Sequence, residues 1–444
     1  MSIHLPNTIA GLKACLEAGE ISVGGAIEQQ AQDFVRINAL THAATSCFAV
    51  PTCLPEMKLP LSGVAVAHKD IFDLSGRRSG LGRDAGAPEV GLKSALAVDR
   101  LAQAGAINLG ALAMAEDACS ATAHTQNLPT PVNPLGHNLA VGGSSSGSAV
   151  AVASGMVYAS LGTDTAGSVR IPAMTCGVLG LKTTHRLVPR DGMTLLSPSL
   201  DSIGILARSS CDLDSVMRVL VPDLNWGAEQ SDETISVGYW LENTAISDEI
   251  RDLITPVMRE HSQEHLDLSA HEQRASTLQE LVMAYEVGQT HAARIAAGQA
   301  CREVQGLGFY GLSMPVAWWR EALRLRPACL SAFVDDAFGQ LDVLMLPLQT
   351  DLLPTTSEVY WGDPAFERAK LLGLHRYCGW VNYLGLPALA MPVANDSDGL
   401  PVSIQLVAKP FHERQLLAIA RQIEKNRHGL QGVLPVLRIE GQTA

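Results

Sequence analysis

Short apolar runs alternate with alanine-rich segments over much of the chain, which predicts strands interleaved with helices. Between residues 61 and about 210, turn residues separate these segments, a pattern typical of an α/β fold in which strands and helices share one sheet. The apolar runs that we interpret as strands are SGVAVAHKD, AGAINLGAL, GMVYASLGTD and GVLGLKTT. This stretch is also dense in Gly, Ala, Ser and Thr.

The flanking stretches have a different pattern. GLKACLEAGEIS near the start predicts an amphipathic helix that ends at a glycine. From about 211 to 340 charge and long side chains increase, and WWREALRLR is helix-like, so we expect a helical region that forms a wall of the substrate pocket. LDVLMLPL and GLPALAMPV predict buried strands, DGLPVSIQLV a hairpin partner of the second, and FHERQLLAIARQIEK a helix. Without repeats or low-complexity linkers, residues 1–444 are predicted to form one domain.

Composition excludes several classes of protein. The chain is 47% hydrophobic and only 17% charged, which is typical of a large core and not of disorder. Its net charge of −13 disfavours binding to nucleic acid or to an anionic membrane. The first residues have no basic region followed by an apolar stretch, so we expect no secretory signal. The nine cysteines form no CxxC pair, and we expect reduced thiols in a cytoplasmic protein without a metal site.

A glycine- and serine-rich loop is the sharpest local feature. Residues 142–148, GGSSSGS, directly precede the small-residue helix expected in AVAVASG. Backbone amides and hydroxyls would gather there at the positive end of a helix dipole. The Lys-Ser/Thr end of a phosphate-binding P-loop is absent, and the glycine spacing does not fit GxGxxG. On its own the loop is compatible with a plain structural turn.

Two further elements give this loop a chemical context. Residues 162–172, GTDTAGSVRIP, form a second small-residue turn that presents Ser168. Upstream, the strand SGVAVAHKD carries Lys69 at its end. Strand alternation places Lys69 on the face of Ala65 and Ala67, and His68 on the opposite face. A lysine among alanines at the end of a buried strand needs polar partners.

GGSSSGSAVAVASG followed by GTDTAGSVRIPAMTCGVLGLKTT resembles the signature of the amidase signature family. Ser168 follows Ser144 by 24 residues and Ser144 follows Lys69 by 75, which matches the family's order of Lys, Ser and Ser. The resemblance extends to LEAGEIS, TPVNP, LDSIGILARS, GLPALAMPV and DGLPVSIQLVAKPF, and is weakest between about 211 and 340. It implies one large domain with a mixed, twisted sheet covered by helices on both faces.

The resemblance also implies roles for single residues. Ser168 would be the nucleophile that the substrate acylates, Ser144 the bridging serine after a cis peptide bond, and Lys69 the base. The oxyanion hole would consist of the backbone amides of Thr165, Ala166, Gly167 and Ser168, and the loops would be held by Ser145, Asp164 and Arg170. The mechanism that the resemblance implies needs no metal and no organic cofactor. Dimers are common in the family, so a homodimer is compatible with the resemblance.

The chemistry is consistent with these roles, because a serine hydroxyl needs a base within hydrogen-bond reach. Lysine acts as a base only when neutral, and with an ordinary pKa of about 10.4 very little of it is neutral at pH 7. Burial that lowers the pKa of Lys69 towards ~7 would raise that fraction several hundredfold or more. The sequence therefore predicts a hydrolase of carboxamide or urea-type C–N bonds that forms an acyl-enzyme. The alternative is the glutaminase subunit of a tRNA-dependent amidotransferase.

Simpler interpretations remain open at this point. Lys69 could pair with Asp70 or Asp73, and both serines could be helix-cap hydroxyls. His68 is expected to be a core histidine or a surface contact.

Four other positions are candidates for the pocket. His124 lies in a stretch that approaches the pocket in the resembling family. Asp117 stands where many members of the family have an aromatic residue and would favour a polar or cationic substrate. Adjacent Trp318 and Trp319 could line the pocket or pack in a helix.

Two glycines common in the family motifs are replaced here, by Ser146 and by Ala166. The methyl group of Ala166 would narrow the site near the oxyanion hole, which bears on the size of the substrate.

Overall fold

The computed structural model describes residues 5–54, 58–226, 235–241 and 245–426. The helices and the short 3-10 helix η1 are α1 (Ile9–Glu17), α2 (Val23–Thr41), α3 (Leu96–Gln103), η1 (Glu116–Ala118), α4 (Ser146–Ala153), α5 (Arg170–Cys176), α6 (Ser210–Leu220), α7 (Asp248–His261), α8 (Ser269–Ala296), α9 (Arg302–Ser313), α10 (Val316–Ala337), α11 (Thr356–Val359), α12 (Arg368–Gly373), α13 (Gly379–Leu384) and α14 (Glu413–Lys425). None of these described helices is long and apolar enough to cross a membrane.

Most strands join one 11-stranded sheet in the order β1-β5-β2-β6-β8-β7-β12-β13-β11-β9-β10, and β3 and β4 pair separately. The strands are β1 (Ala44–Cys47), β2 (Ala65–Lys69), β3 (Arg77–Arg78), β4 (Ala87–Pro88), β5 (Ile107–Leu112), β6 (Ala159–Asp164), β7 (Leu179–Lys182), β8 (Ser202–Ala207), β9 (Val237–Tyr239), β10 (Glu264–His265), β11 (Val343–Pro347), β12 (Ala388–Asn395) and β13 (Pro401–Ala408). β2 runs parallel to β5 and β6, whereas β6 to β8 and β12 to β13 are antiparallel. The predicted mixed sheet is confirmed.

Each face of the sheet has its own apolar layer, because neighbouring strand residues point to opposite sides. Val66 belongs to one cluster, together with residues of α1, α3, α6 and α14. Ala65 and Ala67 belong to the other, together with residues of α2, α4 and α5. The predicted α/β domain with helices on both faces of its sheet is therefore confirmed.

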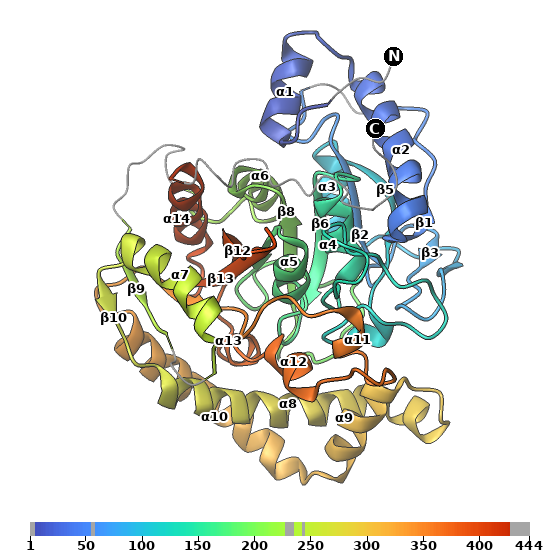
Figure 1. The fold of residues 1–444 in the computed structure, drawn as a ribbon. Helices are drawn as coiled ribbons and strands as arrows, with labels where there is room; N and C mark the ends of the chain where they lie inside the picture. Colours follow the sequence, from blue (N-terminus) through green and yellow to red (C-terminus); the bar gives the residue numbers. More distant parts are fainter. Residues whose placement is uncertain (1–4, 55–57, 227–234, 242–244, 427–444) are drawn as a thin grey trace.

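The region from 211 to 340 is mostly helical, as expected, but it also contains two short strands that the sequence pattern did not indicate. β9 pairs in parallel with β11, and β10 pairs with β9 at the end of the sheet. The long helices α8, α9 and α10 run together along the lower side of the molecule in Figure 1, below α12 and α13. α8 packs most extensively against α9, and it also contacts α13 and α10.

Candidate active site

Lys69 ends β2, a strand whose residues are all buried. Lys69 is 1% exposed, and its ammonium group donates hydrogen bonds of 2.7 Å to Ser144 Oγ and to Thr163 Oγ1. Asp70 pairs with Arg77 instead, at 2.9 Å. The alternative in which Lys69 is an ion-pair partner of Asp70 is therefore wrong.

Burial lowers the pKa of Lys69 to about 7, although the carboxylates of Asp201 and Asp164 favour its protonated form. About half of the Lys69 side chains would then be neutral at pH 7. Burial also raises the pKa of Asp201 to about 6. The hydrogen bonds that Asp201 accepts from Thr165 and two backbone amides lower its pKa, but by less than burial raises it. A neutral amine at this position can accept a proton from Ser144.

Ser144 lies on the loop that opens α4, directly after a cis peptide bond between Gly143 and Ser144. It is fully buried, whereas Ser168 is 8% exposed and lines a cavity. The two loops are joined by a hydrogen bond of 3.1 Å from the Ser145 amide to the Ser168 carbonyl. The described contacts include the Lys69–Ser144 hydrogen bond but none between the hydroxyls of Ser144 and Ser168. Catalytic hydrogen bonds are often long before substrate binds.

The three residues expected to hold the loops make distinct contacts. Ser145 Oγ exchanges hydrogen bonds of 3.3 Å with the backbone of Thr163, which ties the α4 loop to β6. Asp164 accepts hydrogen bonds from the amides of Gly167 and Val169 and pairs with Arg170 at 2.9 Å. The cluster holds the turn that presents Ser168.

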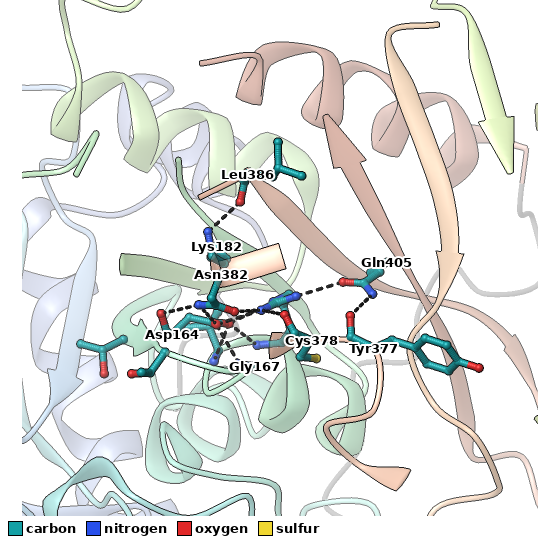
Figure 2. A network of polar contacts seen from close by, with 12 residues as sticks. Asp164, Gly167, Lys182, Tyr377, Cys378, Asn382, Leu386 and Gln405 are labelled. Carbon is teal, nitrogen blue, oxygen red and sulfur yellow. Dashed lines mark hydrogen bonds and ion pairs between the residues drawn. The ribbon is translucent and has the colours of Figure 1, made fainter. Parts of the chain in front are cut away.

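Arg170 extends this cluster to distant parts of the chain. It donates to Gln405 Oε1 at 3.0 Å and to Asn382 Oδ1 at 2.6 Å, and Asn382 Nδ2 donates a bond of 2.9 Å to Asp164 Oδ1. Figure 2 shows Asp164, Asn382 and Gln405 converging in this network. Burial alone would raise the pKa of the Asp164 carboxyl, but the charge and hydrogen bonds of Arg170 hold it well below its usual range.

The expected oxyanion hole differs at one position. The amide of Gly167 donates to Asp164 Oδ1 at 2.8 Å, so it is not available to a substrate. Ala166 and Ser168 line the cavity, and their amides have no acceptor among the described residues. Gly167 has φ 117°, and a Cβ there would lie 2.7 Å from Cys378 Cβ. Glycine is needed here to pack the turn.

Comparisons with known proteins place the chain in a family. The family model described as Amidase matches residues 32–417. The chain belongs to the amidase family. A relative from Deinococcus radiodurans, a Glutamyl-tRNA(Gln) amidotransferase subunit, is 31% identical, and the match covers 94% of this chain and 96% of the relative.

Two solved structures resemble the chain over nearly its whole length. One, described as a crystal structure of amidase, has a TM-score of 0.82 and 25% identity, and the match covers 94% of this chain and 99% of the other. The other is a Glutamyl-tRNA(Gln) amidotransferase subunit of Thermotoga maritima, with a TM-score of 0.77 and 23% identity over 96% of each chain. The second likeness supports the fold alone.

The two candidate pocket residues of the chain differ in their position relative to the cavity. His124 lines the cavity, but Asp117 does not. Asp117 is buried, its carboxylate is bonded by Arg294, and Arg83 lies 3.3 Å away. The expectation that Asp117 faces the substrate is wrong, because these two arginines hold its side chain.

Three other candidates, His68, Trp318 and Trp319, do not line the cavity. His68 lies on the opposite face of β2 from Lys69, as predicted, and accepts a hydrogen bond from the Leu161 amide. Trp319 donates to Glu286 at 3.1 Å and stacks on Tyr285, and neither it nor Trp318 is among the residues that line the cavity.

Within the described residues, one group of side chains has the spacing of a metal site: Glu116, Asp117 and Cys301 lie within 4.8 Å of one another. Both carboxylates face Arg294, which donates to each. Arg83 also lies 3.3 Å from the Asp117 carboxylate, and the two arginines balance the charge of the two carboxylates, so these residues do not fit a cation.

Sequence reasoning missed several residues. Thr163 accepts a hydrogen bond from Lys69, and Asp201 holds Thr165 by a hydrogen bond of 2.6 Å. Both lie in segments that carried the family resemblance, so their position beside the motifs could have identified them. Gln405 also lies in such a segment, DGLPVSIQLVAKPF, whereas Asn382 gave no local indication, because it reaches Arg170 only after more than 200 intervening residues.

Proposed function

We propose that the chain hydrolyses a carboxamide or urea-type C–N bond through an acyl-enzyme on Ser168. The observation that carries the proposal is the Lys69–Ser144 hydrogen bond of 2.7 Å, made by a lysine whose pKa burial lowers to about 7. A buried lysine that is largely neutral can act as a general base. Ser168 lies at the wall of the cavity, on the loop that the Ser145 amide joins to the Ser144 loop.

In the proposed reaction, Ser168 Oγ attacks the carbonyl carbon while its proton passes to Ser144, and the Ser144 proton passes to Lys69. The amides of Thr165, Ala166 and Ser168 stabilise the oxyanion. When the tetrahedral intermediate collapses, the C–N bond breaks and the proton returns through Ser144 to the leaving nitrogen. Water then attacks the ester by the same route, which releases the acid and restores Ser168.

A second candidate function is the glutaminase subunit of a tRNA-dependent amidotransferase. It is favoured by the name of the relative from Deinococcus radiodurans, which matches almost end to end. In that role the same residues would release ammonia from glutamine, and a partner protein would carry out the steps that need ATP and tRNA.

The two functions are separated by testing the purified chain alone. Ammonia or amine release is measured without ATP from a panel of short, long, aromatic and ureido amides, with glutamine included. Hydrolysis of simple amides by the chain alone supports the stand-alone hydrolase. Activity confined to glutamine and dependent on a partner supports the second candidate. Loss of all release in Ser168→Ala assigns the activity to this site.

A further inference from the structure

We infer that the cavity in front of Ser168 selects apolar amides that carry a positive charge away from the scissile bond, and that Glu280 and Glu303 provide this selection. The inference deepens the proposed function and rests on it, because it takes Ser168 as the reacting end of the cavity. It concerns only how the substrate is bound.

The cavity has a volume of about 350 Å³ and an extensive apolar wall. This volume is within the range of small-molecule sites. The apolar side chains that line the cavity with Ser168 include Ala118, Ile171, Leu196, Met283, Leu307 and Leu371. They come from the signature core, from α8 and α9, and from α12. A chain of several methylene groups would bury its surface favourably against them.

The charged groups that line this cavity are both acidic. Glu280 stands on α8 and is exposed, and Glu303 stands in the first turn of α9 and is partly buried. Neither forms an ion pair within the part of the chain that the structure describes. The lining residues found there include no lysine and no arginine. Burial lowers the pKa of His124 and of His375, so both imidazoles are neutral at neutral pH.

One cation lies nearby, in an adjoining cavity of about 250 Å³ that shares His124 and Glu303 with the first. Its lining includes Arg302, whose guanidinium carbon lies 3.5 Å from the centre of the Trp361 ring. Glu303 also borders this second cavity. A cationic ligand in the first cavity is therefore attracted by two carboxylates that have no ion-pair partner among the described residues. An anionic ligand in the same cavity is repelled by these carboxylates, and Arg302 lines only the adjoining cavity.

Free glutamine is a poor fit by the same reasoning. Its carboxylate would enter a cavity whose charged lining groups are acidic, and its ammonium group would be the only favourable charge. A simple chain with a terminal ammonium group has the attraction without the repulsion.

The test measures binding to the Ser168→Ala variant by isothermal titration calorimetry. Three amides of equal chain length are compared: 6-aminohexanamide, hexanamide and adipic acid monoamide. The inference predicts that 6-aminohexanamide binds about fivefold more tightly than hexanamide, as one partly exposed ion pair would give, and that the monoamide binds most weakly. Equal binding of the three, tighter binding of the anion, or no binding by any of them overturns the inference. Tighter binding of the anionic monoamide would indicate that Arg302, and not the two glutamates, determines which charge the site prefers.

Two single variants and their combination test whether Glu280 and Glu303 cause the preference for a cationic amide. In the Ser168→Ala background, Glu280→Gln and Glu303→Gln should each narrow the ratio of cation to anion affinity, and the double variant should abolish the preference. Glu17→Gln is the matched control, because Glu17 is an exposed carboxylate on α1, far from α8 and α9 in Figure 1. If the double variant prefers the cationic amide as strongly as Glu17→Gln does, Glu280 and Glu303 do not provide the selection.

The active chain separates this inference from the proposed function. Hydrolysis of hexanamide through Ser168 without any preference for charge would leave the proposed function standing and overturn the inference. The predicted order of binding without hydrolysis of any amide would leave the charge selection standing and overturn the proposed function.

Discussion

The catalytic groups and much of the cavity wall come from two regions that are built differently. In residues 61–210 the proposed catalytic groups lie at strand ends and helix starts, and Lys69 and Ser144 are at most 1% exposed. In residues 211–340 the groups that face the cavity stand on the long helices α8 and α9, and Glu280 is exposed. The first region can hold a proton relay, which needs burial. The second can vary its side chains without disturbing that relay.

The two regions are nevertheless joined by buried contacts. Glu286 on α8 accepts a hydrogen bond of 2.6 Å from Ser197 Oγ and another of 2.6 Å from Ser199 Oγ. Ser197 also donates its amide to Asp201, which holds Thr165 beside the nucleophile. These contacts fix the helical wall relative to Ser168. Variants in either region can therefore be compared by the same measurements of amide hydrolysis and of Ser168 labelling.

Removing the nucleophile should have the largest effect. Ser168→Ala should lower kcat/KM for any amide substrate by at least ~10⁴-fold, because the acyl-enzyme cannot form. Mass spectrometry should find no adduct with a fluorophosphonate probe, and thermal unfolding should match that of the unmodified chain. A stable Ser168→Ala variant that still carries the adduct would remove Ser168 from the reaction.

Removing the base should have the next largest effect. Lys69→Ala should lower turnover about 10³-fold at pH 7, the usual scale of general-base catalysis. Residual activity should rise at high pH, where hydroxide replaces the lost base. Steady-state rates from pH 6 to pH 10 check this. A variant with most of its activity left at pH 7 would show that another group is the base.

A change in the helical region should affect selectivity more than chemistry. Gly311 on α9 touches α8 so closely that a Cβ would lie 1.8 Å from the Ala284 carbonyl oxygen. Gly311→Val should push the helices apart and change the ratio of kcat/KM between two amides about tenfold, because the cavity wall moves. The labelling rate of Ser168 by fluorophosphonate should stay within about threefold.

The matched variant in the first region is Gly147→Val, where a Cβ would lie 2.3 Å from the Ala43 carbonyl oxygen. This change disturbs the helix that follows Ser144 and should abolish labelling. Equal loss of labelling in the two glycine variants, with both chains folded by circular dichroism, would contradict the division between the regions.

The smallest effect on selectivity is expected at Asp117. Asp117→Asn should leave the ratio of kcat/KM between cationic and neutral amides unchanged, because Asp117 is held by Arg83 and Arg294 outside the cavity. Stability should fall by about 1–3 kcal/mol, since two arginines lose a buried partner. Chemical denaturation measures the loss, and a changed ratio would return Asp117 to the pocket.

The same division governs what could be predicted from the sequence. Lys69, Ser144 and Ser168 could be proposed as the catalytic residues because they lie in motifs with characteristic order and spacing. The strand that carries Lys69 was predicted by alternation, a local property. By contrast, β9 is a short strand that pairs with β11, about 100 residues away, and β10 joins the sheet only by pairing with β9.

Two errors have the same origin. The Gly167 amide looked free because its acceptor, the Asp164 side chain, depends on the conformation of the turn. Asp117 looked available because Arg294, its partner, lies 177 residues further along the chain. Long-range partners of polar groups leave no periodic pattern in a single sequence.

The central claim, that a neutral Lys69 is the base for Ser168, is tested most directly by the pH dependence of fluorophosphonate labelling. Lys69 loses its proton as pH rises through its pKa, so the labelling rate should increase tenfold per pH unit below about 7 and level off above it. The Lys69→Ala variant should lack this transition and react far more slowly. A rate that does not change between pH 5 and pH 9, or the same transition in Lys69→Ala, would contradict the account.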